Sequence, residues 1–299
     1  MKKKILITGG AGYIGSKLAT KLIKIGYEVT VIDALKFSSK SLNHLFSEKN
    51  FHFIKGDVRN KVLIKKLIGE NEFIIPLAAL VGAPLCKKNK SEAISVNLNS
   101  IKYLTKVASK KRKKIIYLTT NSGYGVGKKD KFCDENSPLK PISLYGRTKV
   151  EAEKIVMSYK NSVAFRLATV FGYSYRMRTD LLVNNFVFRS LNEKKLTIFE
   201  PHFRRNYIHV DDVVAALVSL LSSNAPSGVF NIGSGRPTSV AEIANIAADY
   251  YKKTRLFADI SNGSGFWAST EKITSATDWR PRIGIDKGIA STLDALDGR

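Results

Sequence analysis

The chain has 299 residues, of which 44% are hydrophobic and 25% are charged, with 21 glycines, 8 prolines and 2 cysteines. This composition excludes disordered, collagen-like and disulfide-scaffold proteins, and the length suffices for one large α/β domain with a smaller lobe. The formal net charge of +24 is spread over every segment, without a basic stripe of interleaved aromatic residues, so we expect no nucleic-acid partner.

Metal-binding and membrane proteins are disfavoured by the positions of particular residues. Cys86 and Cys133 lie far apart and have no cysteine or histidine partner at metal-ligand spacing, so no metal site is expected. The apolar run near the start is only Ile5–Ile7, and no later segment approaches the roughly eighteen apolar residues of a membrane span. We therefore expect a cytoplasmic protein without a membrane partner.

The first half of the chain alternates short β-branched apolar runs with longer amphipathic stretches, which is typical of a parallel sheet covered on both faces. The predicted strands are Lys4–Thr8, Glu28–Asp33, Phe51–Lys55, Phe73–Leu77, Lys114–Thr119 and Ser162–Leu167. The predicted helices are Gly12–Ile25, Ser39–Ser47, Lys61–Ile68, Ser91–Ser109 and Ser143–Tyr159. This order predicts a doubly wound α/β domain over residues 1–172.

Beyond Gly172 the pattern changes to a polar, arginine-bearing loop, a helix, a short strand and the dense stretch Arg204–Asp212. Gly228–Ile232 has the pattern of a further strand, so we expect residues 206–234 to return to the first domain. Residues 173–205 and 235–299 are expected to form a smaller, discontinuous C-terminal lobe that binds substrate. The helices predicted here are Asp180–Leu191, Ser239–Tyr251 and Ile285–Leu296.

A glycine-rich motif follows the first predicted strand and opens the first predicted helix. Gly10, Gly12 and Gly15 satisfy G-x-G-x-x-G, and Gly9 extends the match to G-x-x-G-x-x-G. Glycines here let backbone amides approach a pyrophosphate at the positive end of the helix. The second strand ends in Asp33, whose carboxylate can bind a ribose 2′-hydroxyl and would repel a 2′-phosphate. The sequence therefore predicts a Rossmann-type site that prefers NAD to NADP.

Tyr145 and Lys149 lie four residues apart at the start of a predicted helix, so their side chains share one face. A free tyrosine, with a pKa of about 10, is a poor base at neutral pH, whereas a nearby ammonium favours the phenolate. Such a pair alone would usually be a packed tyrosine with a surface lysine. Its position is more specific, because the fifth strand delivers the hydroxyl-rich Thr119–Gly125 to the same sheet edge, where a hydroxyl can bind a substrate alcohol.

With these motifs the chain resembles the extended short-chain dehydrogenase/reductase family, which comprises NAD-dependent nucleotide-sugar epimerases and dehydratases. The resemblance covers nearly the whole chain. The segments that carry it are Thr8–Gly15, Leu77–Ala79, Tyr124–Gly125, Tyr145–Lys149, Phe165–Arg166 and Arg205–Asp212.

The resemblance implies a role for individual residues. It places the catalytic hydroxyl on Thr120, beside Tyr145 and Lys149. It implies that Asp57 and Val58 hold the adenine, although Asp57 by itself fits a helix N-cap equally well. It also implies a homodimer through the helices that span Ser91–Ser109 and Ser143–Tyr159. The residues expected at the cofactor are Gly9, Gly12, Tyr13, Ile14, Gly15, Asp33, Asp57, Val58, Leu77, Ala78, Ala79, Tyr145 and Lys149.

Within the family, three segments are most similar to the GDP-heptose 4-dehydrogenases, which oxidise C4 of a GDP-linked heptose with tightly held NAD. These segments are Ile74–Cys86, Thr120–Gly125 and Phe165–Gly172. Dehydratases of the family carry Asp-Glu directly after the catalytic threonine, whereas this chain has Asn121 and Ser122. The lack of both carboxylates disfavours sugar 4,6-dehydration.

The residues expected to bind substrate are Asn121, Ser122, Arg176, Asn185, Arg204 and Arg205. Arg204 and Arg205 can clamp a diphosphate, because guanidinium groups match phosphate geometry; the alternative is a surface arginine pair. Asn185 resembles a family asparagine at the nucleotide phosphates, and the alternative is an ordinary helix residue. Arg176 and Arg178 lie in a loop that is expected to face the substrate cleft, where they can bind sugar hydroxyls or phosphate.

The predicted reaction is oxidation of a nucleotide-sugar 4-hydroxyl. Tyr145 takes the proton while hydride passes to NAD, Thr120 binds the alcohol, and Lys149 holds the phenolate and the nicotinamide ribose. The alternatives are a UDP- or GDP-sugar 4-epimerase, a 4-ketoreductase and a non-catalytic NAD sensor. The presence of Thr120, Tyr145 and Lys149 together argues against the sensor.

Overall fold

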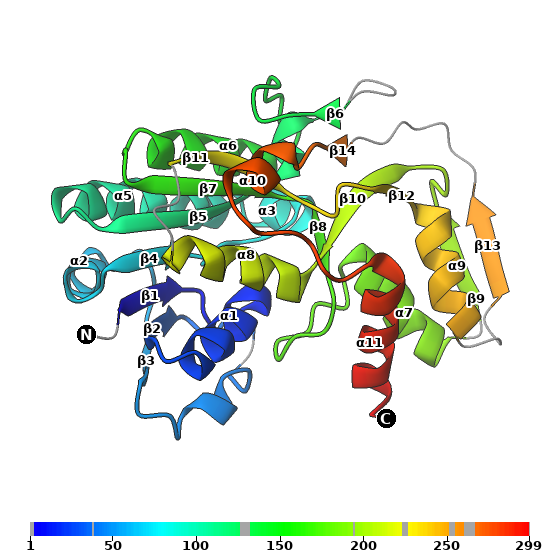
Figure 1. Cartoon of the computed structure of the whole chain (residues 1–299), viewed down its shortest axis with the longest axis horizontal. Helices are drawn as coiled ribbons and strands as arrows, with labels where there is room; N and C mark the ends of the chain where they lie inside the picture. Colours follow the sequence, from blue (N-terminus) through cyan, green and yellow to red (C-terminus); the bar gives the residue numbers. More distant parts are fainter. Residues whose placement is uncertain are drawn as a thin grey trace.

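The computed structural model describes residues 3–37, 39–125, 132–193, 195–222, 227–250, 255–259 and 267–298. A large α/β part and a smaller lobe lie side by side (Figure 1). Within the described ranges, no helix has both the length and the apolar character needed to span a membrane.

The large part is built on a seven-stranded parallel sheet in the order β3-β2-β1-β4-β5-β7-β11, which confirms the predicted doubly wound fold. From β1 the chain adds β2 and β3 on one side, and then β4, β5, β7 and β11 on the other side. The order therefore reverses between β1 and β4, which is where ligands bind in such sheets. The strands are β1 (Lys4–Thr8), β2 (Glu28–Asp33), β3 (Phe51–Lys55), β4 (Phe73–Pro76), β5 (Lys114–Thr120), β7 (Ser162–Leu167) and β11 (Gly228–Ile232).

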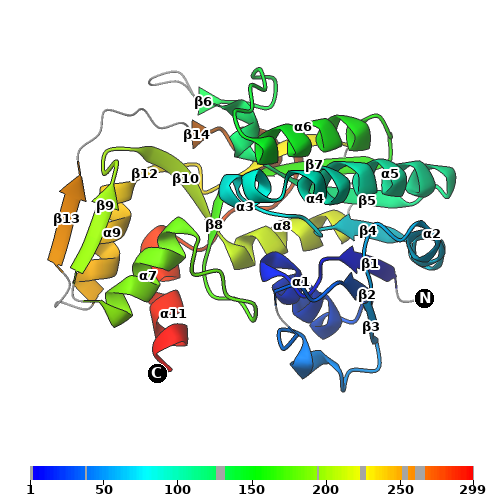
Figure 2. The same cartoon turned by 180° about the vertical axis from the view of Figure 1, so that it is seen from behind.

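Helices cover both faces of this sheet, and each face has its own core. Along β1, Ile5 and Ile7 pack on one face and Leu6 packs on the other, because successive strand residues point to opposite sides. The first face is covered by α1 (Tyr13–Lys24) and α8 (Val210–Ser222). The second is covered by α2 (Lys61–Glu70), α5 (Ser100–Lys110) and α6 (Leu144–Met157), as Figure 2 shows from behind.

Two segments of this part differ from the prediction. The expected helix Ser39–Ser47 is only a single 3-10 turn at Asn43–Leu45, because the buried Ser41 hydroxyl donates to the Ala11 carbonyl and fastens the segment to the glycine loop. Helix α8 was not predicted: from Val213 to Leu221 its residues are apolar except Ser219, and such a run can be a buried strand or a buried helix.

The segment predicted as one helix over Ser91–Ser109 has three consecutive helical parts. Helix α4 (Lys90–Ile94) passes into a π-helical turn at Ser95–Asn99 and then into α5. Helix α3 (Ala83–Lys88) precedes them and was not predicted.

The smaller lobe has a separate core around Phe186, Val187, Tyr207, Ile243 and Leu293. Its two small sheets have the orders β12-β10-β8 and β13-β9. Its elements are β8 (Thr169–Phe171), α7 (Leu182–Asn192), β9 (Lys195–Phe199), β10 (Arg204–His209), β12 (Pro237–Ser239), α9 (Val240–Tyr250), β13 (Arg255–Asp259) and α11 (Ile285–Asp297).

The division into residues 1–172 with 206–234, and 173–205 with 235–299, stays a prediction. Ile273 of α10 (Glu271–Ala276) and the following Trp279 pack into the core of the large part, whereas Phe171 and Tyr207 pack into the core of the smaller lobe. The remaining short strands, β6 (Phe132–Cys133) and β14 (Trp267–Ala268), pair with each other.

Candidate functional site

The glycine loop lies between the carboxyl end of β1 and the start of α1, at the switch point of the sheet. Gly9 has a φ of +74°, and a Cβ on it would lie 2.5 Å from the Ala78 backbone nitrogen, so only glycine fits. A Cβ on Gly15 would lie 2.5 Å from the Gly9 carbonyl oxygen. Gly12 begins α1 without a capping side chain, and the first turn carries no acidic residue. The positive end of α1 is thus open to an anionic ligand.

Asp33 and the residues after β4 border this loop. The Asp33 carboxylate accepts from the Ala11 backbone at 3.0 Å and from the Leu35 backbone at 2.8 Å, which fixes its orientation beside the loop. On the other side, the half-buried Leu77–Ala79 follow β4, and the Leu77 amide donates to the Thr8 carbonyl at 2.8 Å. An open helix end, a loop that admits only glycine and a neighbouring carboxylate fit a dinucleotide with a free ribose 2′-hydroxyl.

Asp57 is not a helix N-cap, so that alternative is wrong. Asn60 caps α2 and accepts from the Leu63 amide at 3.1 Å. The Asp57 carboxylate instead forms an ion pair with Arg59, which donates from its backbone at 2.8 Å and from its guanidinium at 2.9 and 2.5 Å. This partner, which the sequence reasoning missed, lowers the pKa of Asp57. Val58 lies half-buried beside Leu80.

Tyr13 and Ile14 open α1, but their side chains serve packing. The buried Tyr13 hydroxyl donates to the Gly172 carbonyl at 2.6 Å and lies 3.2 Å from the Asn184 amide nitrogen, and burial raises its pKa. Ile14 packs against the core of the large part. The Tyr13 side chain therefore joins the glycine loop to the end of β8, and only its backbone remains for a cofactor.

Thr120 and Tyr145 come together from different elements. Thr120 is the last residue of β5, and Tyr145 lies in the first turn of α6, which begins after the N-cap Ser143. Their side chains share a hydrogen bond. Thr120 also accepts from the Ser122 backbone at 3.2 Å and bonds the Ser122 hydroxyl at the same distance. Lys149 follows one turn later on α6, as the spacing predicted.

Burial sets the ionisation of this group. It raises the pKa of Tyr145 to about 12, with a further increase from Cys86, while Arg178 and the bond to Thr120 lower it. Burial also lowers the pKa of Lys149 to about 7, and Glu153 opposes that shift. A phenolate at Tyr145 therefore requires positive charge nearby, which a protonated Lys149, Arg178 and an oxidised nicotinamide ring can each supply.

A polar pocket opens beside Thr120. Arg205 and Asn206 of β10 line it together with Asn121 and Ser122, and Leu167, Ala168 and Thr169 complete it. Asn121 Oδ1, Arg205 Nε and Asn206 Oδ1 are buried and have no hydrogen-bond partner within the described part of the chain. These atoms can bind the polar groups of a ligand. The sequence reasoning missed Thr169 and Asn206.

The structure does not form the predicted clamp of Arg204 with Arg205. Of the two arginines, only Arg205 lines the pocket. The exposed Arg204 donates to the Pro237 carbonyl at 3.4 Å and lies 3.6 Å from Glu242. For Arg204, the alternative of a surface arginine is therefore the observed one.

The two arginines of the loop before α7 have different surroundings. The Arg176 guanidinium lies 5.0 Å from the centre of the Phe37 ring, and the charge of Asp33 acts on its pKa, which places it toward the glycine loop. Arg178 is the one whose charge acts on Tyr145, and it forms an ion pair with Asp180 through bonds of 2.6 and 2.5 Å. The arginine at the catalytic group is thus Arg178 rather than Arg176.

On α7, the Asn185 side chain donates to the Thr179 carbonyl at 3.0 Å. Its neighbour Asn184, which the sequence reasoning missed, is fully buried and bonds the Gly172 amide at 2.9 Å, the Tyr13 hydroxyl and the Arg178 carbonyl. The sequence carried a signal for this role, since Asn184 lies on the apolar face of the predicted helix, where a buried polar side chain needs partners.

No group of three metal-ligating side chains occurs among the residues described.

Sequence comparison supports the same class of protein. Residues 5–233 match the NAD dependent epimerase/dehydratase family. The chain is 30% identical to the uncharacterized UDP-glucose epimerase YtcB of Bacillus subtilis, with 98% of both proteins covered. It is 27% identical to human dTDP-D-glucose 4,6-dehydratase, covering 98% of this chain and 89% of the relative.

Solved structures with the same fold carry the cofactor. The UDP-glucuronic acid 4-epimerase of Bacillus cereus, in complex with UDP-glucuronic acid and NAD, superposes with a TM-score of 0.88 at 26% identity, over 99% of both chains. The dTDP-glucose 4,6-dehydratase of Bacillus anthracis, in complex with NAD, has a TM-score of 0.89 at 24% identity, over 99% of this chain and 97% of that one. The chain therefore belongs to the NAD dependent epimerase/dehydratase family, whose fold and cofactor it shares.

Proposed function

We propose that this protein oxidises the C4 hydroxyl of a nucleotide sugar with NAD. The observation that carries the proposal is the convergence of Thr120, at the end of β5, with Tyr145 and Lys149 of α6. This group lies beside a glycine loop that fits a dinucleotide, and the relatives described above are named for nucleotide-sugar epimerases and dehydratases.

Each side chain of the group has one task in this reaction. Tyr145 accepts the proton of the sugar 4-hydroxyl, and the neighbouring Thr120 holds that hydroxyl through its own hydroxyl group. Lys149, and Arg178 from the loop before α7, supply the positive charge that the phenolate needs. Bound NAD supplies the hydride acceptor.

The cofactor would be held by the glycine loop from Gly9 to Gly15, by Asp33 at the adenosine ribose and by Leu77–Ala79 along its length. Asp57 and Val58 would contact the adenine. The Asp57 carboxylate would then bind the adenine and the Arg59 guanidinium at the same time. Arg205 is the residue that would meet the diphosphate, since its Nε is buried and unpartnered at the pocket.

The pocket argues against 4,6-dehydration. The positions that follow Thr120 hold the amide of Asn121 and the hydroxyl of Ser122, so no carboxyl group stands there to remove and return a proton during loss of water. The expected product is consequently a 4-keto sugar that keeps its C6 oxygen.

A 4-epimerase is the second candidate, favoured by the 30% identity to YtcB over nearly all of both chains. It would use the same first step and then return the hydride to the other face of the ketone. The finer prediction, a GDP-linked heptose as substrate, rests on the similarity of three segments of the sequence alone. YtcB and the human and Bacillus cereus relatives are named for UDP- and dTDP-sugars instead.

The test is mass spectrometry of the purified enzyme with NAD and a panel of GDP-, UDP- and dTDP-sugars that includes GDP-heptose. A product lighter by two hydrogens identifies a 4-dehydrogenase, and an isomer separated by chromatography identifies an epimerase. A product lighter by one water would contradict the proposed reaction. The variant Tyr145→Phe should lose turnover, whereas Tyr159→Phe, at the far end of α6, should keep it; no turnover with any sugar would refute the proposal.

A further inference from the structure

Lys149 is buried, with an aromatic ring against its ammonium and an acidic residue one turn further along the same helix. Its ammonium is 4.1 Å from the centre of the Tyr117 ring, which faces it from β5. Glu153 follows one turn later on α6, on the same face as Lys149, and both side chains are almost fully buried. The ring face contacts the ammonium directly, and the charge of Glu153 favours the protonated form of Lys149.

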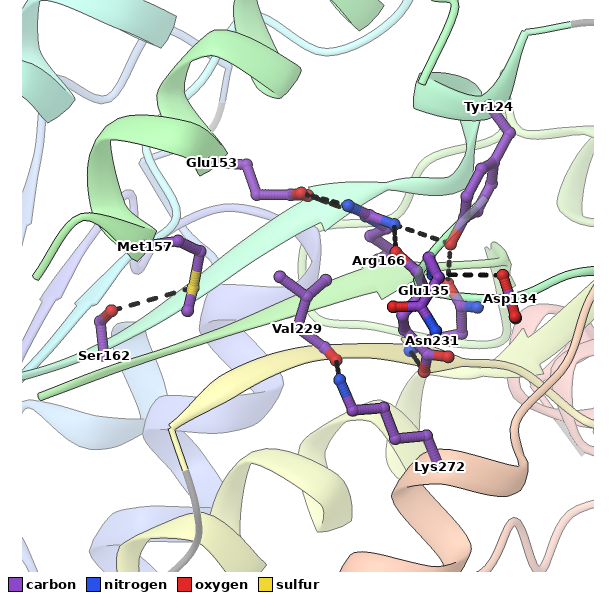
Figure 3. A network of polar contacts seen from close by, with 11 residues as sticks. Tyr124, Asp134, Glu135, Glu153, Met157, Ser162, Arg166, Val229, Asn231 and Lys272 are labelled. Atoms are coloured by element: carbon purple, nitrogen blue, oxygen red, sulfur yellow. Dashed lines mark hydrogen bonds and ion pairs between the residues drawn. The ribbon is translucent and has the colours of Figure 1, made fainter. Parts of the chain in front are cut away.

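Glu153 is held in place by a buried network with Arg166, Tyr124 and Asn231 (Figure 3). The Arg166 guanidinium of β7 donates to both Glu153 oxygens, with bonds of 3.1, 3.1 and 2.6 Å. It also donates to the Tyr124 hydroxyl at 2.9 Å, which in turn donates to Asn231 of β11 at 2.7 Å. Arg166 thereby fixes the orientation of the Glu153 carboxylate and links α6 to the sheet.

Tyr117 contributes its ring and not its hydroxyl. The side chain is fully buried, and its hydroxyl oxygen has no partner within the described part of the chain. The charges of Tyr145 and Glu153 both act to raise the pKa of Tyr117, which places this residue close to both of them. A tyrosine whose hydroxyl is unsatisfied costs stability, so what it offers here is the face of its ring.

We propose that Tyr117 and Glu153 are positioning residues that hold Lys149 as a fixed ammonium beside Tyr145. The proposal rests on the catalytic role given to Lys149 above. Without these two partners, the pKa of this buried lysine falls below about 7, so the neutral amine, which cannot stabilise a phenolate, predominates at neutral pH. The reaction would then fail although Thr120, Tyr145 and Lys149 were all present.

The other charged and titratable groups around Lys149 act in identifiable directions. Tyr145 on the same helix favours the ammonium only as a phenolate. Arg178, from the loop before α7, and the Cys86 thiol of α3 act on Tyr145. Arg166 forms a buried ion pair with Glu153, which offsets its charge. Glu153 is therefore the one charged group found to favour the Lys149 ammonium among the residues described.

The test measures the pKa of Lys149 directly, by NMR of protein labelled with ¹³C at the lysine Cε and titrated without cofactor or substrate. The signal is assigned as the one absent from Lys149→Arg. The wild-type pKa should be about 7. Glu153→Gln and Tyr117→Leu should each lower it by about one pH unit. The conservative Tyr117→Phe should retain the wild-type value, because the ring remains.

Glu151→Gln is the matched control, since it removes the same charge from an exposed neighbour on α6 and should change neither the pKa nor turnover. An unchanged Lys149 pKa in folded Tyr117→Leu or Glu153→Gln would overturn the role of that residue. Should Glu153→Gln fail to fold because Arg166 is left unpaired, Glu153→Gln combined with Arg166→Met removes both charges and repeats the test. A protein that turned over no nucleotide sugar would refute the proposed function and leave these pKa values unaffected.

Discussion

At the scale of the residue, Lys149 links catalysis to stability. Its ammonium is buried where the fold makes protonation unfavourable, which lowers its pKa to about 7, whereas the proposed reaction needs it charged. Tyr145 is shifted in the opposite sense, to about 12, although the reaction needs its phenolate. Burial thus favours the neutral form of both groups, whereas the reaction needs the Lys149 ammonium and the Tyr145 phenolate. Nearby charges favour these charged forms.

This burial predicts a dependence of stability on pH. Above pH 7 the folded chain releases the proton of Lys149, whose pKa is about 7, whereas an unfolded lysine keeps it up to about pH 10.4. The free energy of unfolding should therefore rise from about pH 7 to about pH 10, by at most ~1.4 kcal/mol per pH unit from this group. Urea denaturation of the wild type and of Lys149→Met at several pH values measures the difference, and equal slopes would contradict it.

At the scale of the element, α7 is joined to the glycine loop and to the end of β8 through Asn184. Replacement of this buried side chain by leucine removes its bonds to the Gly172 amide, the Tyr13 hydroxyl and the Arg178 carbonyl, of which the hydroxyl and the carbonyl keep another partner. We expect Asn184→Leu to lower the free energy of unfolding by roughly 2–4 kcal/mol, measured by urea denaturation. Asn185→Leu, which removes one bond from a half-buried residue, should cost less than about 1 kcal/mol. Equal effects of the two would refute the role of Asn184.

The turn between β1 and α1 allows a second prediction at this scale. In Gly9→Ala, the added Cβ would lie 2.5 Å from the Ala78 nitrogen at a φ of +74°, so the loop must move away from β4. We expect NAD affinity, measured by calorimetry, to fall by at least about tenfold. Gly26→Ala has a comparable φ of +92° with no atom within 4 Å and lies at the other end of α1, so it should lose some stability and keep its NAD affinity. Unchanged affinity in Gly9→Ala would count against the proposed cofactor loop.

At the scale of the whole molecule, the formal net charge of +24 surrounds a pocket proposed to take an anionic substrate. A positive field speeds the approach of an anion and is screened by salt. We expect kcat/KM for the nucleotide sugar to fall several-fold between about 20 and about 200 mM NaCl, with kcat nearly unchanged. Initial-rate kinetics test this, and a kcat/KM independent of salt would contradict attraction of the substrate by the net charge.

The homodimer stays a prediction, which light scattering in solution can test.

The sequence by itself determined the order of the elements and the local motifs. The strands at Lys4–Thr8, Glu28–Asp33, Phe51–Lys55 and Ser162–Leu167 have the predicted bounds, because β-branched runs between turn residues depend little on distant contacts. The glycine loop and the placement of Tyr145 and Lys149 on one helix likewise follow from short-range spacing. Fold and cofactor could therefore be read before any tertiary contact was known.

Only the tertiary structure decided which side chains meet. The helix Val210–Ser222 was missed because its run of apolar residues can be a buried strand or a buried helix when only the sequence is known. The separation of Arg204 from Arg205, and the position of Arg178 rather than Arg176 at Tyr145, depend on how strands and loops are oriented after packing. The contacts of Lys149 with Tyr117, and of Glu153 with Arg166, join segments more than ten residues apart. No local pattern specifies such pairs, because their geometry exists only once the sheet and α6 have packed.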